Sequence, residues 1–407
     1  MVLKNKIKNS LLYIFFEGLS KGGNTLIFLI AASLLAKNEY VNLLSLFSLE
    51  GLFIIISPFY YTDVLFKLRD KYSFKDINRL SSKLIFFYCI ILALIIAVFS
   101  SFIFKMYGFD SYITLFSIIF IVGARLIFQV QSVNFQIDEN HKRAVRLKAI
   151  PFLASFFVGL VGFLLFENKI AGFFIGRSLG FLLISVKSIY AFFLNFNFEI
   201  DTNFIKDFLK RASNLIIIGL GGWFLGYGML NILKYYYNDD VNYQIGLMLN
   251  MWSLFLLLAN GINGVYFPEF RKKYNINIKS ADKLFNQTFI LYMGILTLCI
   301  IGLLFLNLIS IQSSFFKLLQ LHTYLHIIPF VLCIFFAQIF QYVSVPYYIV
   351  KDKFRNLSII GLITNVISIF LIFTHHLYEH LVSLEILYVI ILCYIIRSLP
   401  VYIYRKK

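Results

Sequence analysis

Charged side chains lie inside long apolar stretches of this 407-residue sequence. In chain order, the first stretch holds Glu17 and Lys21, the second Glu50, the fourth Arg125 and the sixth Arg177. A charge at the centre of a bilayer costs at least about 2.5 kcal/mol, so such groups usually face a protein interior or a water-filled cavity. Basic groups outnumber acidic ones, and the guanidinium fork of Arg matches phosphate oxygens. We therefore expect a cavity that binds an anion such as a phosphate or pyrophosphate.

Arg125 is the strongest candidate ligand for that anion, because it lies on the most continuous polar face of the chain. Gln129, Ser132 and Gln136 follow it at helical spacing. Asn24 lies close to Lys21 in the first stretch and extends a second polar face. The candidate head-group ligands are Lys21, Arg125 and Arg177. The alternative is that these bases only form internal ion pairs with Glu17 and Glu50.

The two carboxylates in the middle of the first half, Glu17 and Glu50, are the candidates for coupling transport to protons or sodium ions. The alternative for Glu17 is that it neutralises Lys21 one helical turn away. We expect no other cofactor. We also expect no metal site, because the outer-loop histidines have no Cys or Asp beside them. Those histidines are His375, His376 and His380.

The polar residues in the second half are mostly neutral. Amide and aromatic side chains suit sugar hydroxyls, so we expect several of them to line the substrate cavity. The alternative is that they hold helices together, since Asn, Ser and Gly are common at contacts between membrane helices. The candidates are Tyr227, Asn231, Asn250 and Asn260.

The composition requires that these residues be positioned by membrane-spanning helices. Hydrophobic residues make up 60% of the chain and charged residues only 14%, which excludes an ordinary soluble domain. The net charge of +17 is scattered between apolar runs, so we expect no nucleic-acid partner. Twelve stretches have spanning length. They are residues 11–36, 41–65, 84–105, 112–136, 149–166, 170–194, 215–236, 243–267, 287–310, 323–349, 357–377 and 384–404.

The loops between these stretches differ in charge from one side to the other. Lys and Arg concentrate in alternate loops, and the positive-inside rule assigns that side to the cytoplasm. The expected orientation places both termini in the cytoplasm. The opposite loops hold only Lys37, Lys105, Lys169, Lys234 and Lys317.

The chain divides into two halves of six stretches each. We expect an N-terminal lobe over residues 1–194, an amphipathic cytoplasmic linker over 195–214 and a C-terminal lobe over 215–407. Both halves begin in the cytoplasm, so their repeat must be parallel. Pro58 and Pro268 each mark the cytoplasmic end of the second helix of a half. The predicted fold is an all-α polytopic membrane protein of twelve transmembrane helices, an architecture that in transporters binds substrate between the two bundles.

Two segments resemble one superfamily of membrane transporters. The first hairpin reads FEGLSKGGNTLIFLIAASLLAKNEYVNLLSLFSLEGLFIIISPF, and the eighth stretch runs from Gly246 through Pro268 with Arg271 and Lys272 after it. Both resemble the opening helix pairs of polysaccharide and lipid-linked oligosaccharide flippases in the multidrug, oligosaccharidyl-lipid and polysaccharide exporter (MOP) superfamily. Val41 and Asn42 stand where members often have glycine.

The resemblance implies a flippase of the bacterial cytoplasmic membrane. By alternating access it would move an undecaprenyl-pyrophosphate-linked oligosaccharide, such as an O-antigen repeat unit, from the cytoplasmic to the periplasmic leaflet. Lys21, Arg125 and Arg177 would correspond in character to the family's cationic cavity. The partners implied are the lipid-linked glycan, membrane lipids, and the polysaccharide polymerase with its assembly proteins.

Other functions fit the sequence less well. A multidrug cation exporter of the same superfamily should have a cavity dominated by carboxylates, which is the opposite of the bias here. A major-facilitator sugar symporter should carry a glycine-rich basic loop after the second span, where this chain has KLRDKYSFKD. An enzyme that polymerises glycans needs a large outer loop, and the outer loops here are short. We therefore expect a transporter and not an enzyme.

Overall fold

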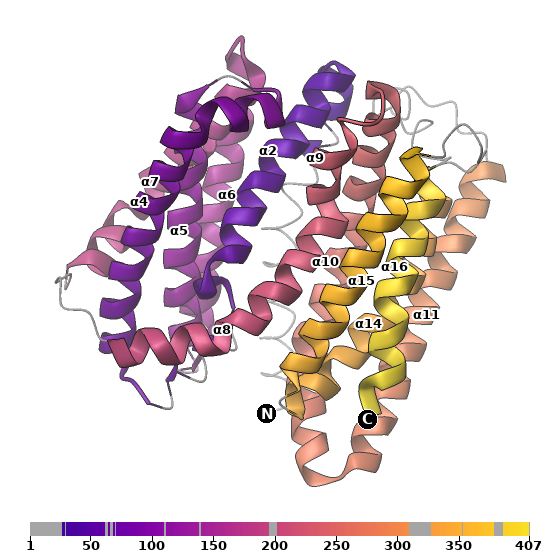
Figure 1. Cartoon of the computed structure of the whole chain (residues 1–407). Coiled ribbons are helices and arrows are strands. Elements are labelled where there is room, and N and C mark those ends of the chain that lie inside the picture. The colour runs from indigo at the N-terminus through magenta and orange to yellow at the C-terminus, as the bar shows by residue number, and fades with distance from the viewer. Residues whose placement is uncertain are drawn as a thin grey trace. The chain divides into compact units, whose positions relative to one another are not determined.

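Helices make up most of the chain that the structure describes, and no strand occurs there. The structure is a computed structural model (Figure 1). It describes residues 27–28, 30–61, 64–65, 68–69, 71–109, 111–137, 140–194, 202–308, 327–351, 353–377 and 386–406. Glu17, Lys21 and Asn24 therefore lie outside the described residues.

The chain forms two compact units. One contains Asn42–Leu220, and the other combines Phe28–Val41 with Gly221–Lys407. The first unit contains most of α2 (Lys37–Ile56), the 3-10 helix η1 (Pro58–Tyr60), α4 (Phe74–Tyr107), α5 (Tyr112–Ile137), α6 (His141–Leu165), α7 (Lys169–Phe193) and most of α8 (Thr202–Trp223). The second contains the π-helical turn η2 (Phe224–Gly228), α9 (Met229–Leu233), α10 (Asp239–Ile276), α11 (Ile278–Leu308), α14 (Ile328–Val350), α15 (Phe354–Leu377), α16 (Ile386–Ile403) and η3 (Tyr404–Lys406).

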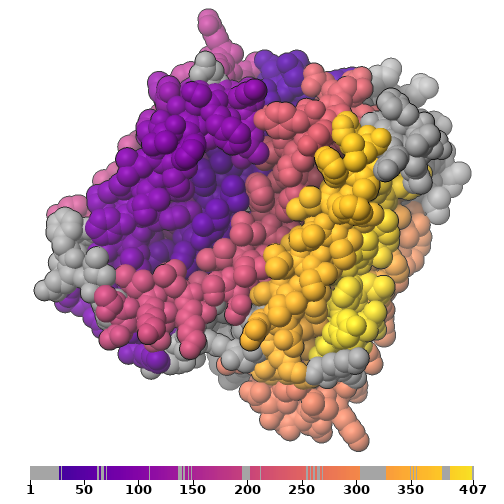
Figure 2. Space-filling view, viewed as in Figure 1, coloured from indigo at the N-terminus to yellow at the C-terminus, as the bar shows by residue number. Residues whose placement is uncertain are grey.

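Nine helical segments among the described residues are long and apolar enough to cross a membrane. A tenth apolar segment, Ala149–Leu165, is shorter and belongs to α6. Apolar side chains on the outside of these helices suit contact with lipid. In the space-filling view α15 runs along an open face of its unit (Figure 2), and Leu362, Val366 and Phe370 on it are exposed. These properties are those of a multi-pass membrane protein.

The segment predicted as a linker is largely helical. From Thr202 it forms the start of α8, and the division between the units falls later, after Leu220. Its side chains Phe204 and Phe208 are fully buried. The Phe208 ring lies 4.5 Å from the ring of Phe59, and Lys71 Nζ donates to Asp207 at 2.8 Å. The apolar side of this helix thus packs on the first unit.

Small residues allow α6 and α7 to approach closely. Gly172, Gly176 and Gly180 recur every four residues on α7 and so share one face. A side chain added at Gly176 would place its Cβ 2.5 Å from the Val158 carbonyl oxygen, and one at Gly162 would come within 2.1 Å of the Gly172 carbonyl oxygen. Small residues at such contacts are typical of membrane helices. This close contact fixes where α7 presents its other side chains.

Polar side chains mark where several helices begin. Ser73 accepts a hydrogen bond from the backbone N–H of Asp76 at the start of α4. Asn140, Asn168 and Asn238 accept equivalent bonds at the starts of α6, α7 and α10. Such caps satisfy backbone donors that have no partner within the helix. They set the helical register that positions the charged residues inside each unit.

Candidate functional site

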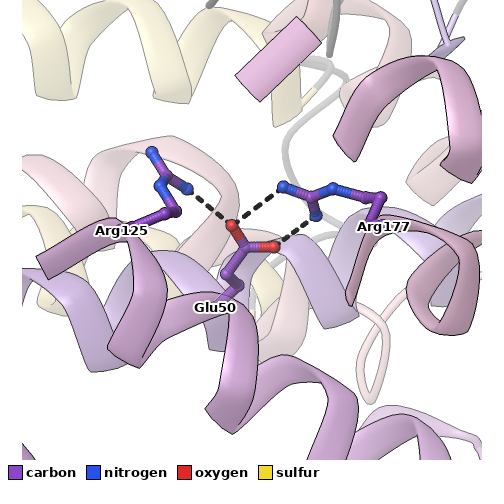
Figure 3. A network of polar contacts seen from close by, with 3 residues as sticks. All are labelled: Glu50, Arg125 and Arg177. Atoms are coloured by element: carbon purple, nitrogen blue, oxygen red, sulfur yellow. Dashed lines mark hydrogen bonds and ion pairs between the residues drawn. The ribbon is translucent and has the colours of Figure 1, made fainter. Parts of the chain in front are cut away.

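Glu50 is the centre of a buried ionic cluster in the first unit. Three helices contribute one residue each: α2 carries Glu50, α5 carries Arg125 and α7 carries Arg177. The side chains of Glu50 and Arg177 are 1% and 2% exposed, whereas that of Arg125 is 24% exposed. Figure 3 shows the two guanidinium groups approaching the carboxylate from opposite sides. The cluster therefore joins residues far apart in the sequence.

Hydrogen bonds link all three side chains. Arg125 Nη1 donates to Glu50 Oε1 at 2.5 Å. Arg177 grips both carboxylate oxygens, with Nη1 donating to Oε2 at 2.5 Å and Nη2 to Oε1 at 3.2 Å. A bidentate pair between Arg and a carboxylate is among the stronger and more directional of protein interactions. The Arg177–Glu50 pair is thus the fixed part of the cluster.

Aromatic rings enclose the two guanidinium groups. The Arg177 guanidinium carbon lies 4.9 Å from the Phe47 ring centre and 5.5 Å from that of Phe173. The Arg125 guanidinium carbon lies 5.0 Å from the Phe152 ring centre. Gly159 on α6 leaves room for the Arg177 stem, because a Cβ there would lie 2.5 Å from Arg177 Cγ. Ring faces favour cations and exclude water, which strengthens the ion pairs.

The cluster carries a formal charge of +1, since two guanidinium groups share one carboxylate. Arg125 and Arg177 therefore both have an acidic partner in Glu50. Ion pairing with Glu50, the alternative that the sequence leaves open, is the observed arrangement. Arg177 is buried, and both of its terminal nitrogens donate to Glu50, whereas the Arg125 side chain stays 24% exposed. Arg125 is therefore the member of this cluster that can contact a further anion.

The polar stripe that follows Arg125 on α5 serves partly to pack helices. Ser132 is buried, and its Oγ donates to the Ala144 carbonyl of α6 at 3.1 Å. Gln129 is partly buried. The side chain of Gln136 lies outside the described part of the structure. The stripe therefore does not act as one continuous cavity wall, because Ser132 is committed to a neighbouring helix.

The neutral candidates of the second half lie in the other unit. Tyr227 in η2 packs its ring 5.8 Å from that of Phe28. Asn231 on α9 and Asn250 on α10 are fully buried. Within the described residues the Asn250 amide has no hydrogen-bond partner for either its oxygen or its nitrogen. The side chain of Asn260 is not described. The expected site residues thus fall into two groups, one in each unit.

The outer histidines take part in contacts within the second unit. Tyr237 Oη and His375 Nδ1 lie 2.7 Å apart and share a hydrogen bond. The His376 ring lies 4.6 Å from that of Tyr236. His380 lies outside the described residues, and among those that are described no group of three His, Cys, Asp or Glu side chains could hold a metal ion.

One basic residue that the site prediction left out is buried in the second unit. Arg397 on α16 is 8% exposed, and its Nη1 donates to the Gly221 carbonyl oxygen at 2.7 Å. The sequence signal was an Arg within the last apolar stretch, near the end expected at the cytoplasm. Long basic side chains near helix ends usually reach the membrane surface. This one instead turns inward.

Comparison with known proteins identifies the fold. No protein-family model matches the chain, and no curated protein matches it significantly. Among solved structures, a MOP superfamily transporter from Pyrococcus furiosus, described as having a binding pocket of reverse polarity that suggests a different function, superposes with a TM-score of 0.65 at 10% identity. The match covers 98% of this chain and 95% of that one.

Two further solved structures agree with this match. The outward-facing form of a multidrug resistance MATE family transporter of the MOP superfamily gives a TM-score of 0.63 at 11% identity, covering 97% of this chain and 93% of that one. The eukaryotic MATE transporter AtDTX14 gives 0.66 at 10% identity, covering 98% and 95%. MATE transporters have twelve transmembrane helices in two lobes. The predicted all-α polytopic fold is thus confirmed, and it is the fold of MOP superfamily transporters.

Proposed function

We propose that this chain transports an anionic, lipid-linked solute across the membrane by alternating access. The cargo proposed is an undecaprenyl-pyrophosphate-linked oligosaccharide, moved from the cytoplasmic to the periplasmic leaflet of the bacterial cytoplasmic membrane. The termini would lie in the cytoplasm, and the polymerase and assembly proteins that use the exported repeat unit would be functional partners. The chain itself would catalyse no covalent reaction.

The observation that carries this proposal is the charge of the buried groups. Among the described residues, the buried Asp, Glu, Lys and Arg side chains are Glu50, Lys83, Arg177 and Arg397. Arg125, partly buried, adds a further positive charge beside Glu50. An interior with this excess of cations attracts phosphate groups and repels cationic drugs. The polar headgroup of a polyprenyl pyrophosphate matches that bias.

A multidrug exporter of the same fold is the second candidate, and the likeness to MATE transporters favours it. A cationic drug needs a carboxylate that can bind it. Glu50 is the buried carboxylate of the described residues, and two guanidinium groups already occupy its oxygens. The Pyrococcus furiosus transporter, with its pocket of reverse polarity, supports the view that this fold accommodates cavities of opposite charge. The fold therefore does not distinguish the two cargoes, and the choice between them rests on the charge of the buried side chains.

A cellular experiment separates the two candidates. The gene is deleted in its host, and surface glycan, lipid-linked repeat units in the inner leaflet and accumulation of a cationic dye are measured. We expect surface glycan to disappear and repeat units to accumulate, with dye accumulation unchanged. Complementation with the unchanged chain should restore export. An increase in dye accumulation with normal surface glycan would instead support the multidrug exporter.

A pair of variants tests whether glycan export depends on the Glu50 cluster. Arg125→Gln removes the accessible positive charge beside Glu50, and we expect it to lose most glycan export at normal membrane abundance. Lys273→Gln is the matched control, because it removes one positive charge from a partly exposed side chain outside the cluster. Equal export by the two variants would contradict the role of the cluster.

A further inference from the structure

Arg397 is a buried cation with no carboxylate partner in the described part of the chain. Its hydrogen bond to the described residues goes to the Gly221 carbonyl oxygen, at 2.7 Å. A backbone carbonyl supplies only a partial negative charge, so the full charge of the guanidinium stays uncompensated. Burying a charge without a counter-ion is costly, and proteins seldom retain such a group without a use for it.

The helix that Arg397 contacts has an irregular turn just after the contact. The run from α8 into α9 is interrupted at η2, where Gly226 has the non-helical angles φ −90° and ψ −136°. Tyr394, one turn before Arg397 on α16, donates its hydroxyl to the Leu225 carbonyl at 2.6 Å. Gly221 admits the neighbouring helix closely, because a Cβ there would lie 2.1 Å from Asn365 Nδ2. Local π-helical turns often occur at functional sites.

Two buried hydrogen-bond donors on helices beside Arg397 have no acceptor among the described residues. Tyr342 lies on α14 one turn after Gln338, whose Nε2 donates to the Oγ of Ser398, the neighbour of Arg397 on α16, at 3.4 Å. Trp252 on α10 packs its ring 5.6 Å from that of Tyr394. The Tyr342 hydroxyl and the Trp252 indole N–H are both buried and have no hydrogen-bond partner among the described residues. Buried polar atoms are nearly always paired, so these two point to a missing acceptor.

The chemistry of the missing acceptor follows from the donors. Arg397 and the Trp252 indole can only donate, and the Tyr342 hydroxyl donates readily. No carboxylate of the described residues competes for them. A ligand that accepts several hydrogen bonds and carries negative charge matches the chemistry of all three groups.

We propose that the second unit holds an anion site of its own, formed by Arg397, Tyr342 and Trp252, which binds a phosphate or pyrophosphate group. This inference rests on the proposed function, because the transported head group would be the ligand. The site is separate from the Glu50 cluster and belongs to a different compact unit. It adds Arg397 and two aromatic donors to the residues that select the cargo.

Equilibrium binding tests the site directly. The full chain is placed in nanodiscs of phosphatidylcholine, and binding of radiolabelled farnesyl pyrophosphate is measured. Arg397→Gln should weaken binding about tenfold or more, because it removes charge-assisted hydrogen bonds. Tyr342→Phe should weaken binding about threefold to tenfold by removing one donor. Tyr266→Phe is the matched control, since it removes a buried hydroxyl of the same unit that donates to the Val343 carbonyl.

Tyr342→Phe keeps the test decisive if Arg397→Gln disturbs folding. Its hydroxyl has no partner among the described residues, so the variant should unfold at the temperature of the unchanged chain or above it. Weaker binding by such a stable variant supports a ligand site. Binding equal to that of Tyr266→Phe, for both Tyr342→Phe and Arg397→Gln, overturns the inference.

Two displacement measurements identify the source of the anion. The variants then distinguish failure of the second anion site from failure of the proposed function. Displacement of the label by inorganic pyrophosphate supports recognition of the head group. Displacement by phosphatidylglycerol alone overturns the assignment to transported cargo and indicates a phospholipid site. If Arg125→Gln weakens binding while Arg397→Gln and Tyr342→Phe do not, only the second site fails. If the unchanged chain neither binds the probe nor exports glycan, the proposed function fails with it.

Discussion

The two units bury positive charge in different ways. In the first, Arg125 and Arg177 share the carboxylate of Glu50, which accepts hydrogen bonds from both. In the second, Arg397 is held by the Gly221 carbonyl, and no carboxylate of the described residues lies near it. The first cluster contains its own counter-ion, whereas the second has none among the described residues. We infer that Glu50 chiefly stabilises the fold and, under the proposed function, that Arg397 chiefly binds the cargo.

The largest effect should come from removing the shared carboxylate charge. Glu50→Gln leaves the buried Arg177 and the partly buried Arg125 without a counter-ion, and we expect a loss of about 3 to 5 kcal/mol in the free energy of unfolding. Membrane abundance and thermal unfolding in detergent measure it. The double variant Glu50→Gln with Arg177→Met should recover part of the loss, because it removes one of the stranded charges. A stable single variant would mean that the cluster contributes little to the fold.

Removal of Arg397 should affect export and leave stability nearly unchanged, in contrast to removal of the Glu50 charge. Arg397→Met deletes an uncompensated charge together with one hydrogen bond to a carbonyl, so the two effects nearly cancel. We expect the free energy of unfolding to change by about 1 kcal/mol or less, with normal abundance and lost glycan export. The same unfolding assay, paired with surface-glycan measurement, checks both parts. Instability equal to that of Glu50→Gln would remove the contrast between the units.

Arg125 should fall between these extremes. Its guanidinium is 24% exposed, and Arg177 keeps Glu50 paired when Arg125 is lost. Export should be damaged most by Arg125→Glu, less by Arg125→Ala and least by Arg125→Lys, because Lys keeps the charge but loses the fork. Abundance should stay near normal for Ala and Lys. Full export by the Glu variant would exclude a role in binding the head group.

The sequence predicts which residues are unusual better than it predicts their partners. Arg125, Arg177 and Glu50 are recognisable because charges are rare in apolar stretches. Their pairing depends on contacts across 75 and 127 residues of chain, which helical periodicity does not reveal. The glycines at every fourth position of α7 are a local signal, and they do predict close helix packing.

For Arg397, the local sequence predicts the wrong direction of the side chain. Its position near the end of the last apolar stretch favours a side chain that reaches the membrane surface. Its guanidinium instead donates to the carbonyl oxygen of Gly221, which lies 176 residues earlier in the chain and just before the π-helical turn. The glycine-rich run GLGGWFLGYG indicates an irregular helix, but it does not show which side chain donates a hydrogen bond to its carbonyl groups.

The smallest effect should come from an exposed ion pair, which gives the baseline for the comparison. Lys273 Nζ and Glu269 Oε1 lie 2.9 Å apart, one turn along α10, with side chains 35% and 47% exposed. Water screens such a pair, so Glu269→Gln should change the free energy of unfolding by about 0.5 kcal/mol or less and leave export unchanged. Glu50→Gln makes the same chemical change in a buried setting. A similar loss for both variants would show that the detergent assay responds to any lost carboxylate, and the contrast between the shared carboxylate and Arg397 would then have to be measured in lipid.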